Sequence, residues 1–153
     1  MLSTHRLSPK NQVTIPRGRA LAGSAEVSHL RGLPLMLAKP GTSERFPYVM
    51  LLTEPEMQRR EQAILNDAGF TGEQKLQAIT LLNGRAANMA MDAQNRIVLA
   101  QNLIEHLKLS ERDVFFVDTN TALQAWNPEH YKRWAGLDEV QPPAIDLDRF
   151  LAI

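Results

Sequence analysis

The sequence contains no cysteine, which excludes disulfide bonds, thiolate zinc sites and a cysteine nucleophile. It has no apolar run close to the roughly 20 residues that a membrane-spanning helix needs. The first ten residues lack the apolar core and the small-residue cleavage site of a signal peptide. We therefore expect a cytoplasmic protein with no membrane partner.

Net charge is also lacking, because 17 basic residues balance 17 acidic ones. The charges are distributed unevenly, however, since seven of the basic residues but only two of the acidic ones lie within residues 1–45. Such a distribution permits a basic face on a neutral molecule, and a nucleic acid needs only a local positive field. Chance variation of surface charge would look the same, so charge indicates a partner only together with other features.

Catalytic and metal-binding patterns are absent as well. The four histidines show no metal-ligand spacing; they are His5, His29, His106 and His130. There is no glycine-rich phosphate loop, and no triad or pair of carboxylates stands out. We expect no enzymatic activity, no metal and no cofactor.

A diverged internal repeat is the main feature that is present. Residues 7–16, LSPKNQVTIP, align with residues 91–100, MDAQNRIVLA. One turn asparagine and two alternating apolar residues match in each copy: Asn11, Val13 and Ile15 with Asn95, Ile97 and Leu99. Residues 53–60 align with residues 126–133, so the offset falls from 84 to 73 and the first copy carries an insertion.

Both copies predict the same order of elements. A short alternating strand precedes a helix, a hairpin of two apolar strands and a second helix. The helices are predicted to begin near Pro16 and after Pro55 in the first copy, and at Gln101 and after Pro128 in the second. The hairpin strands are predicted at residues 33–38 and 48–52, and at residues 114–117 and 123–126.

These elements divide the chain into four parts: a first unit (1–54), a helical linker (55–85), a second unit (86–135) and a tail (136–153). Within the linker, Gly69 interrupts the helix. The segment from Thr71 to Gln74 predicts a capping box for a second helix. That helix carries an apolar stripe, made of Leu76, Ile79 and Leu82.

The turns before the two short strands carry the candidate site. Asparagine tolerates a positive φ angle better than other non-glycine residues, so Asn11 and Asn95 predict a left-handed turn residue in both copies. Arg96 can reach a guanine edge or a phosphate, or it can pair with Asp92 four residues earlier. Both interpretations remain open at this point.

The turn segments resemble a known superfamily. Residues 8–16, SPKNQVTIP, are similar to the S-x-K-G-Q-V-T-I-P signature of AbrB-type DNA-binding domains. Residues 91–99, MDAQNRIVL, are similar to the D-x-x-G-R-x-x-I-P signature of the same SpoVT-AbrB superfamily. Two copies in one chain, the second ending in Trp126 and Trp134, resemble the MraZ family over nearly the whole chain. Both tryptophans close apolar segments, so we expect them in the core rather than stacked on bases.

The resemblance implies an α+β fold, a double SpoVT-AbrB swapped-hairpin β-barrel with flanking helices. It also implies a nucleoid-associated transcriptional regulator that binds repeats in double-stranded promoter DNA upstream of a division and cell-wall gene cluster. The chains are expected to form a homo-oligomer, and the family's assembly is a ring. The expected DNA-binding residues are Lys10, Arg17, Arg19, Gln94, Asn95 and Arg96.

The sequence departs from the MraZ pattern in its first copy. That family carries Asp and Arg, spaced D-x-x-x-R, in both copies, whereas Ser8 and Gln12 occupy these positions in the first copy here. Asparagine replaces the turn glycine twice, and Ala100 replaces a proline. These departures keep an alternative open, namely an antitoxin-like or other protein-interaction module whose barrel has lost DNA binding.

Overall fold

The computed structural model describes residues 2–21, 27–138 and 147–152, which form a mixed α+β fold. Its strands are β1 (Leu2–Arg6), β2 (Gln12–Thr14), β3 (His29–Ala38), β4 (Arg45–Leu52), β5 (Ala87–Ala90), β6 (Arg96–Val98), β7 (Asp113–Asp118) and β8 (Leu123–Trp126). Its helices are the 3-10 helix η1 (Arg19–Leu21), α1 (Glu54–Asn66), α2 (Gly72–Arg85), α3 (Gln101–Leu107), α4 (Pro128–Ala135) and α5 (Leu147–Leu151).

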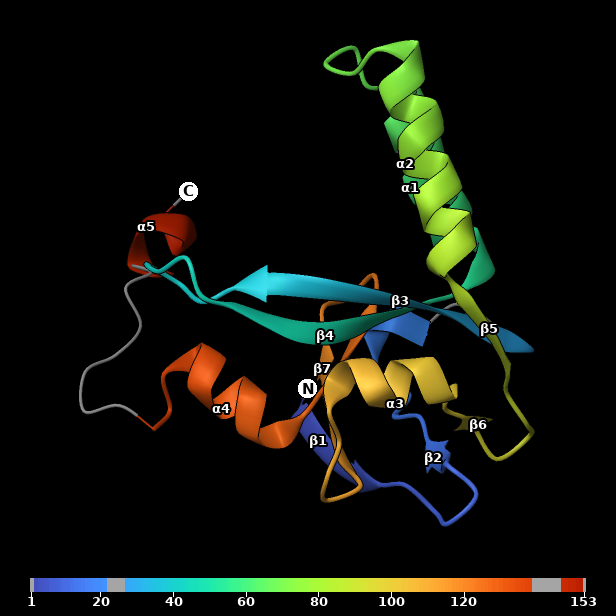
Figure 1. Ribbon diagram of the computed structural model, residues 1–153, viewed down its shortest axis with the longest axis vertical. Coiled ribbons are helices and arrows are strands. Elements are labelled where there is room, and N and C mark those ends of the chain that lie inside the picture. The colour runs from blue at the N-terminus through green and yellow to red at the C-terminus, as the bar shows by residue number, and fades with distance from the viewer. Residues whose placement is uncertain (1, 22–26, 139–146, 153) are drawn as a thin grey trace.

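Six strands form a curled antiparallel sheet in the order β1-β7-β8-β4-β3-β5, and β2 pairs separately with β6 (Figure 1). This order follows the internal repeat. With the offset of 84, β1 is equivalent to β5, and β3 is equivalent to β7. The β1–β7 pair of Arg6 with Asp113 is therefore equivalent to the β5–β3 pair of Ala90 with His29. The first strand of each copy thus pairs with a strand of the other copy, β1 with β7 and β5 with β3.

Strand pairing at the centre of the sheet gives a different offset for the second pair of aligned segments, residues 53–60 and 126–133. β4 and β8 pair around Met50 and Gln124, which places the equivalent residues 74 positions apart. The helix N-caps agree, because the side chain of Thr53 caps α1 and that of Asn127 caps α4. The predicted offset of 73 is wrong by one residue, because the two prolines that it matches occupy the second position of α1 and the first of α4.

A helix start near Pro16 is also wrong, because up to residue 21, where this described range ends, the structure has only the short η1. In the second unit the corresponding element is α3, which buries Leu103 and Ile104. The equivalent residues of the first unit are Arg19 and Ala20. The first unit therefore lacks the apolar stripe that would stabilise a helix against the sheet.

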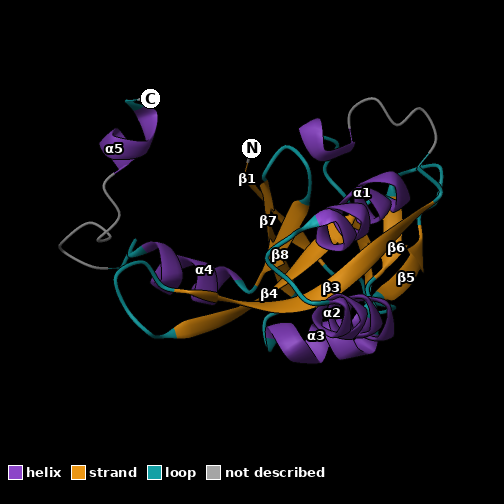
Figure 2. Cartoon of the chain, turned by 90° about the horizontal axis from the view of Figure 1, so that it is seen from above, coloured by secondary structure: helices purple, strands orange, loops and turns teal. Residues whose placement is uncertain are grey.

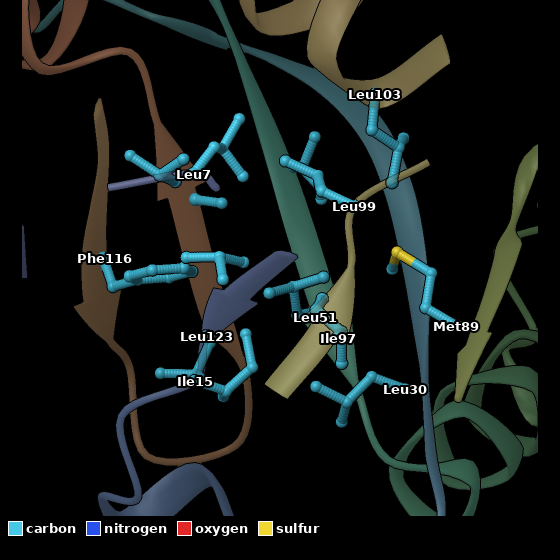
Figure 3. Packing of buried hydrophobic residues seen from close by; sticks show 14 of the residues in the cluster. Leu7, Ile15, Leu30, Leu51, Met89, Ile97, Leu99, Leu103, Phe116 and Leu123 are labelled. Atoms are coloured by element: carbon cyan, nitrogen blue, oxygen red, sulfur yellow. The ribbon is translucent and has the colours of Figure 1, made fainter. Parts of the chain in front are cut away.

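The main core lies between the sheet, the β2–β6 pair and α3 (Figure 3). It includes the labelled side chains of Leu7, Ile15, Leu30, Leu51, Met89, Ile97, Leu99, Leu103, Phe116 and Leu123. Gly32 lies where a Cβ atom would stand 2.7 Å from Met89 Cε and 2.8 Å from Leu103 Cδ1. Phe116 occupies the equivalent position of β7, so a glycine in one unit corresponds to a large ring in the other.

α4 lies beside the end of the β3–β4 hairpin that carries the loop (Figure 2), and an aromatic cluster joins them. Trp126 is fully buried, and its ring stacks on Tyr48 with centroids 5.4 Å apart. Trp134 is half-buried and donates its Nε1–H to the carbonyl of Ala38 at 2.9 Å. The prediction of a core position is confirmed for Trp126, and Trp134 packs at the border of the same cluster.

The helices α1 and α2 form a hairpin that projects from the sheet, away from the β2–β6 pair (Figure 1). The predicted capping box is confirmed, since Thr71 and Gln74 each accept the other's backbone N–H. The apolar stripe is only partly covered: Leu82 packs on the sheet residues, whereas Leu76 is 68% exposed. Its upper part lies beyond the reach of the sheet (Figure 1).

The predicted tail is described only in part, because residues 139–146 and 153 lie outside the described residues. The large apolar side chains of α5 are exposed; they are Leu147, Phe150 and Leu151. Within the described ranges, no helix combines the length and the apolar character that crossing a bilayer requires.

Candidate nucleic-acid interface

The candidate interface is the ribbon of β2 and β6 with the two turns before it, the first turn (residues 8–12) and the second turn (residues 92–96). Val13 pairs with Ile97 at the centre of the ribbon. These residues are equivalent in the repeat, so a local twofold axis passes through this pair. Both are buried, and the outer face of the ribbon carries the half-buried or exposed Gln12, Thr14, Arg96 and Val98.

The two turns have the same backbone conformation. Asn11 and Asn95 both have a φ angle of 62°, which confirms the predicted left-handed residue in each copy. Asn11 N–H donates to Ser8 O at 2.9 Å, and Asn95 N–H donates to Asp92 O at 3.0 Å. The departure from the family pattern in the first copy therefore leaves the turn geometry unchanged.

In each turn, the side chain of the first residue accepts backbone N–H groups from later residues and so closes the turn. Ser8 Oγ accepts the N–H groups two and four residues later, at 3.2 and 3.0 Å. Asp92 Oδ1 accepts the equivalent N–H groups, both at 2.9 Å, and Asp92 Oδ2 also accepts Nε–H of Arg96 at 2.9 Å. The hydroxyl of Ser8 thus replaces a carboxylate without carrying its charge, and the pairing of Arg96 with Asp92 is observed.

Acid should loosen the second turn before the first. Hydrogen bonds from Arg96, first from its backbone and then from its side chain, hold the pKa of Asp92 below its ordinary value. The stabilisation is complete above the ordinary aspartate pKa of about 3.9 and is lost as the pH falls through the lowered value. Ser8 has no charge to lose. In an NMR titration below pH 5, the amide signals of residues 94–96 should move while those of residues 10–12 stay.

The variant Asp92→Ser provides the matched control, because it gives the second turn the closing group of the first. Its amide signals in residues 94–96 should no longer respond to acid. Equal acid shifts in both turns of the unsubstituted protein would contradict the role of Asp92.

Each turn asparagine is held by a residue of the other unit. Arg17 Nη1 donates to Asn95 Oδ1 at 2.9 Å, and Asn11 Nδ2 donates to Gln101 Oε1 at 3.5 Å. Arg17 and Gln101 are equivalent in the repeat, so the local twofold axis relates these two bonds. The conformation of each turn therefore depends on both units.

The first turn has a further contact that sequence reasoning missed. Arg112 Nη2 donates to Ser8 O at 2.5 Å and to Asn11 Oδ1 at 2.7 Å. Arg112 is half-buried in the loop between α3 and β7, and its own carbonyl accepts the N–H of Leu7 at 2.8 Å. The equivalent residue of the first unit is Ser28. No motif in the sequence marks Arg112, because it lies outside the matched blocks.

The structure brings most of the predicted site residues to the turns. The second turn gathers Arg17, Gln94, Asn95 and Arg96, and Lys10 is exposed on the first turn. Arg19 lies apart on η1, where the N–H of Ala20 donates to the carboxylate of Asp118 at 3.2 Å. η1, which carries Arg19, therefore lies beside the β7–β8 turn.

Other parts of the described chain offer no comparable site. Among the residues that the structure describes, no group of histidine and acidic side chains could hold a metal ion. A pocket at the start of α4 has a lining of mixed charge. There burial, followed by the positive charges of Arg133 and Lys108, lowers the pKa of His130.

Comparisons with known proteins support an MraZ-like chain. Residues 82–141 match the model of the MraZ protein family, whose description likens it to antitoxins. Over 84 residues the chain is 26% identical to the transcriptional regulator MraZ of Acetivibrio thermocellus. That match spans 55% of this chain and 58% of the relative, so it covers little more than half of each. The chain is MraZ-like, and the family match falls mainly on the second unit, which keeps Asp92 and Arg96.

Proposed function

We propose that this MraZ-like chain is a sequence-specific DNA-binding transcriptional regulator with a double swapped-hairpin barrel. The observation that carries the proposal is the pair of equivalent turns, one from each unit, which surround one exposed ribbon with cationic side chains. The name of the A. thermocellus relative, a transcriptional regulator, supports the same class. The division and cell-wall gene cluster as target follows from the family resemblance.

A two-stranded ribbon has the right width to enter the major groove of B-DNA. In this proposal the outer face of the β2–β6 ribbon contacts base edges. Glutamine suits adenine and arginine suits guanine, while methyl groups contact thymine, so Gln12, Arg96 and Thr14 supply three kinds of contact. Arg96 uses its Nε–H for Asp92, and its side chain is 41% exposed, which leaves guanidinium donors available for a base.

The residues beside the ribbon would hold the DNA backbone. Lys10 and Gln94 are equivalent in the repeat and lie on the two turns, so they would contact DNA on opposite sides of the local twofold axis. Arg17, with Asn95, and Arg19 complete the proposed contact surface. Cations of this kind position a protein on phosphates, and base contacts supply the specificity.

Association of several chains would strengthen the binding. A chain without net charge holds bulk DNA weakly, but a homo-oligomer that presents several ribbons on one side gains affinity through avidity. A ring of chains at the nucleoid, bound to promoter repeats, is the assembly that we propose from the family resemblance.

Selection of binding sites from random double-stranded DNA tests the function directly. The unsubstituted protein should enrich one motif at low salt. Arg96→Ala should relax the preference at one guanine position, which costs about 1–3 kcal/mol there. Arg59→Ala, which removes an exposed arginine of the α1–α2 hairpin, should enrich the original motif. Failure of the unsubstituted protein to enrich any motif would refute sequence-specific binding.

A protein-interaction module is the second candidate. It is favoured by exposed apolar side chains on the α1–α2 hairpin, where Leu65, Phe70 and Leu76 are 47%, 48% and 68% exposed. Protein interaction would become the preferred function if the folded protein bound no DNA at low salt.

A further inference from the structure

We propose that Arg112 is a positioning residue, which fixes the first turn in its DNA-contacting conformation from the second unit. The inference rests on the proposed function, because it concerns a turn that would contact DNA. It assigns a role to a residue outside both repeat motifs.

The hydrogen bonds of Arg112 converge on the residue that defines the turn. Its Nη2 reaches both Ser8 O and Asn11 Oδ1, and the other end of the Asn11 amide donates to Gln101. Asn11 is thereby bonded at both ends of its side chain while its backbone holds a φ angle of 62°. A non-glycine residue in this region is strained, so external hydrogen bonds select the conformation.

Each turn asparagine accepts a hydrogen bond from an arginine of the other copy, Arg112 at Asn11 and Arg17 at Asn95, but only the first turn also lacks a charged closing group. In the second turn the carboxylate of Asp92 closes the loop, and charge strengthens its hydrogen bonds. In the first turn the neutral hydroxyl of Ser8 does so. Arg112 supplies a charged donor from outside to the turn that a neutral hydroxyl closes, and the second turn has Ser28 at the place equivalent to Arg112.

The donor groups of Arg112 are not arranged as a contact to a DNA phosphate would require. Its Nη2 is directed at protein acceptors, and the bonds are partly buried. Removing Arg112 should therefore weaken DNA binding by loosening the turn and not by removing a phosphate contact. The two effects differ in the salt dependence, because each lost phosphate contact flattens the slope of log K against log salt by about 0.9.

The test compares Arg112→Gln and Arg112→Lys with the charge-matched control Arg6→Gln. Arg6 pairs with Asp113, next to Arg112, and its side chain is 70% exposed. Arg112→Gln should lower the affinity for the selected DNA motif about tenfold, as loss of a charged hydrogen bond does, with an unchanged salt slope. Arg112→Lys keeps the charge, but its ammonium nitrogen lies one bond short of the Nη2 position that donates to Ser8 and Asn11, so it should show a similar loss. Arg6→Gln should bind almost as the unsubstituted protein does.

A second substitution tests whether Arg112 influences DNA binding through the conformation of Asn11. Asn11→Gly in the Arg112→Gln background should restore most of the affinity, because glycine adopts a positive φ without help. NMR signals of residues 8–12 should report the loosened turn in Arg112→Gln, and circular dichroism should show that each variant is folded at the temperature of the binding assay.

The possible results separate the two proposals. Normal affinity of Arg112→Gln, a salt slope flattened by about one, full activity of Arg112→Lys, or no rescue by Asn11→Gly would each overturn the positioning role while the DNA-binding function stands. Absence of DNA binding by the unsubstituted protein would overturn the proposed function, and this inference with it.

Discussion

Replacing Trp126 with alanine should lower the free energy of unfolding by about 3–5 kcal/mol. The ring is fully buried, and it contacts Tyr48, Tyr131 and Trp134 with centroid separations of 5.4, 5.5 and 5.4 Å. Its Nε1–H also donates to Gln124 Oε1 at 3.0 Å, so the substitution leaves an acceptor unpaired. The loss is a large part of the roughly 5–15 kcal/mol that stabilises a typical domain. Urea unfolding followed by far-ultraviolet circular dichroism measures it.

Two further variants serve as comparisons for Trp126→Ala. Trp126→Phe keeps a ring in the cluster and should cost less than the alanine variant. Leu76→Ala removes an apolar side chain that is 68% exposed, and it should change stability by no more than about 0.5 kcal/mol. A Trp126→Ala effect as small as that of Leu76→Ala would mean that the aromatic cluster is not a packed core.

The sequence predicted the turns and short strands well because each signal occurs twice. One asparagine in a polar segment says little, but Asn11 and Asn95 at the same place in two copies predicted a shared positive φ, which both have. The first helix was predicted wrongly for a related reason. The repeat suggested a counterpart of α3, but Arg19 and Ala20 replaced the apolar residues that hold α3 on the core. Tertiary contacts, not the repeat, decide whether that helix forms.

The arrangement of the candidate site could be predicted only in part. The residue types and their turns are visible in the sequence, but the pairing of strands that lie far apart in the chain decides which turn each residue reaches. Arg17 follows the first turn by a few residues, yet it bonds Asn95 of the second turn. Arg112 lies 101 positions from Asn11 and belongs to no motif. Contacts of this kind arise from the pairing of β2 with β6, and no periodicity within one copy encodes them.

Substituting Lys10, Arg17 and Arg19 together with alanine should have the largest effect on DNA binding. These side chains are exposed, and they belong to the segment in which basic residues are concentrated. If each contacts a phosphate, the slope of log K against log salt should flatten by about 2–3, since each neutralised phosphate contributes about 0.9. Affinity for all DNA sequences should fall at least about 100-fold, because each charged hydrogen bond contributes roughly 1.5 kcal/mol or more. Fluorescence anisotropy at several salt concentrations measures both quantities.

The matched control removes the same number of positive charges from the α1–α2 hairpin, by substituting Arg59, Lys75 and Arg85 with alanine. The hairpin points away from the turns (Figure 1), so this variant should keep the affinity and the salt slope of the unsubstituted protein apart from a small effect of net charge. Equal losses in the two triple variants would mean that total charge, and not a basic face at the turns, governs binding. An unchanged slope in the folded Lys10, Arg17 and Arg19 variant would remove the proposed phosphate contacts. The exposed apolar residues of the hairpin would then become the better guide to function, because they remain available for a protein partner.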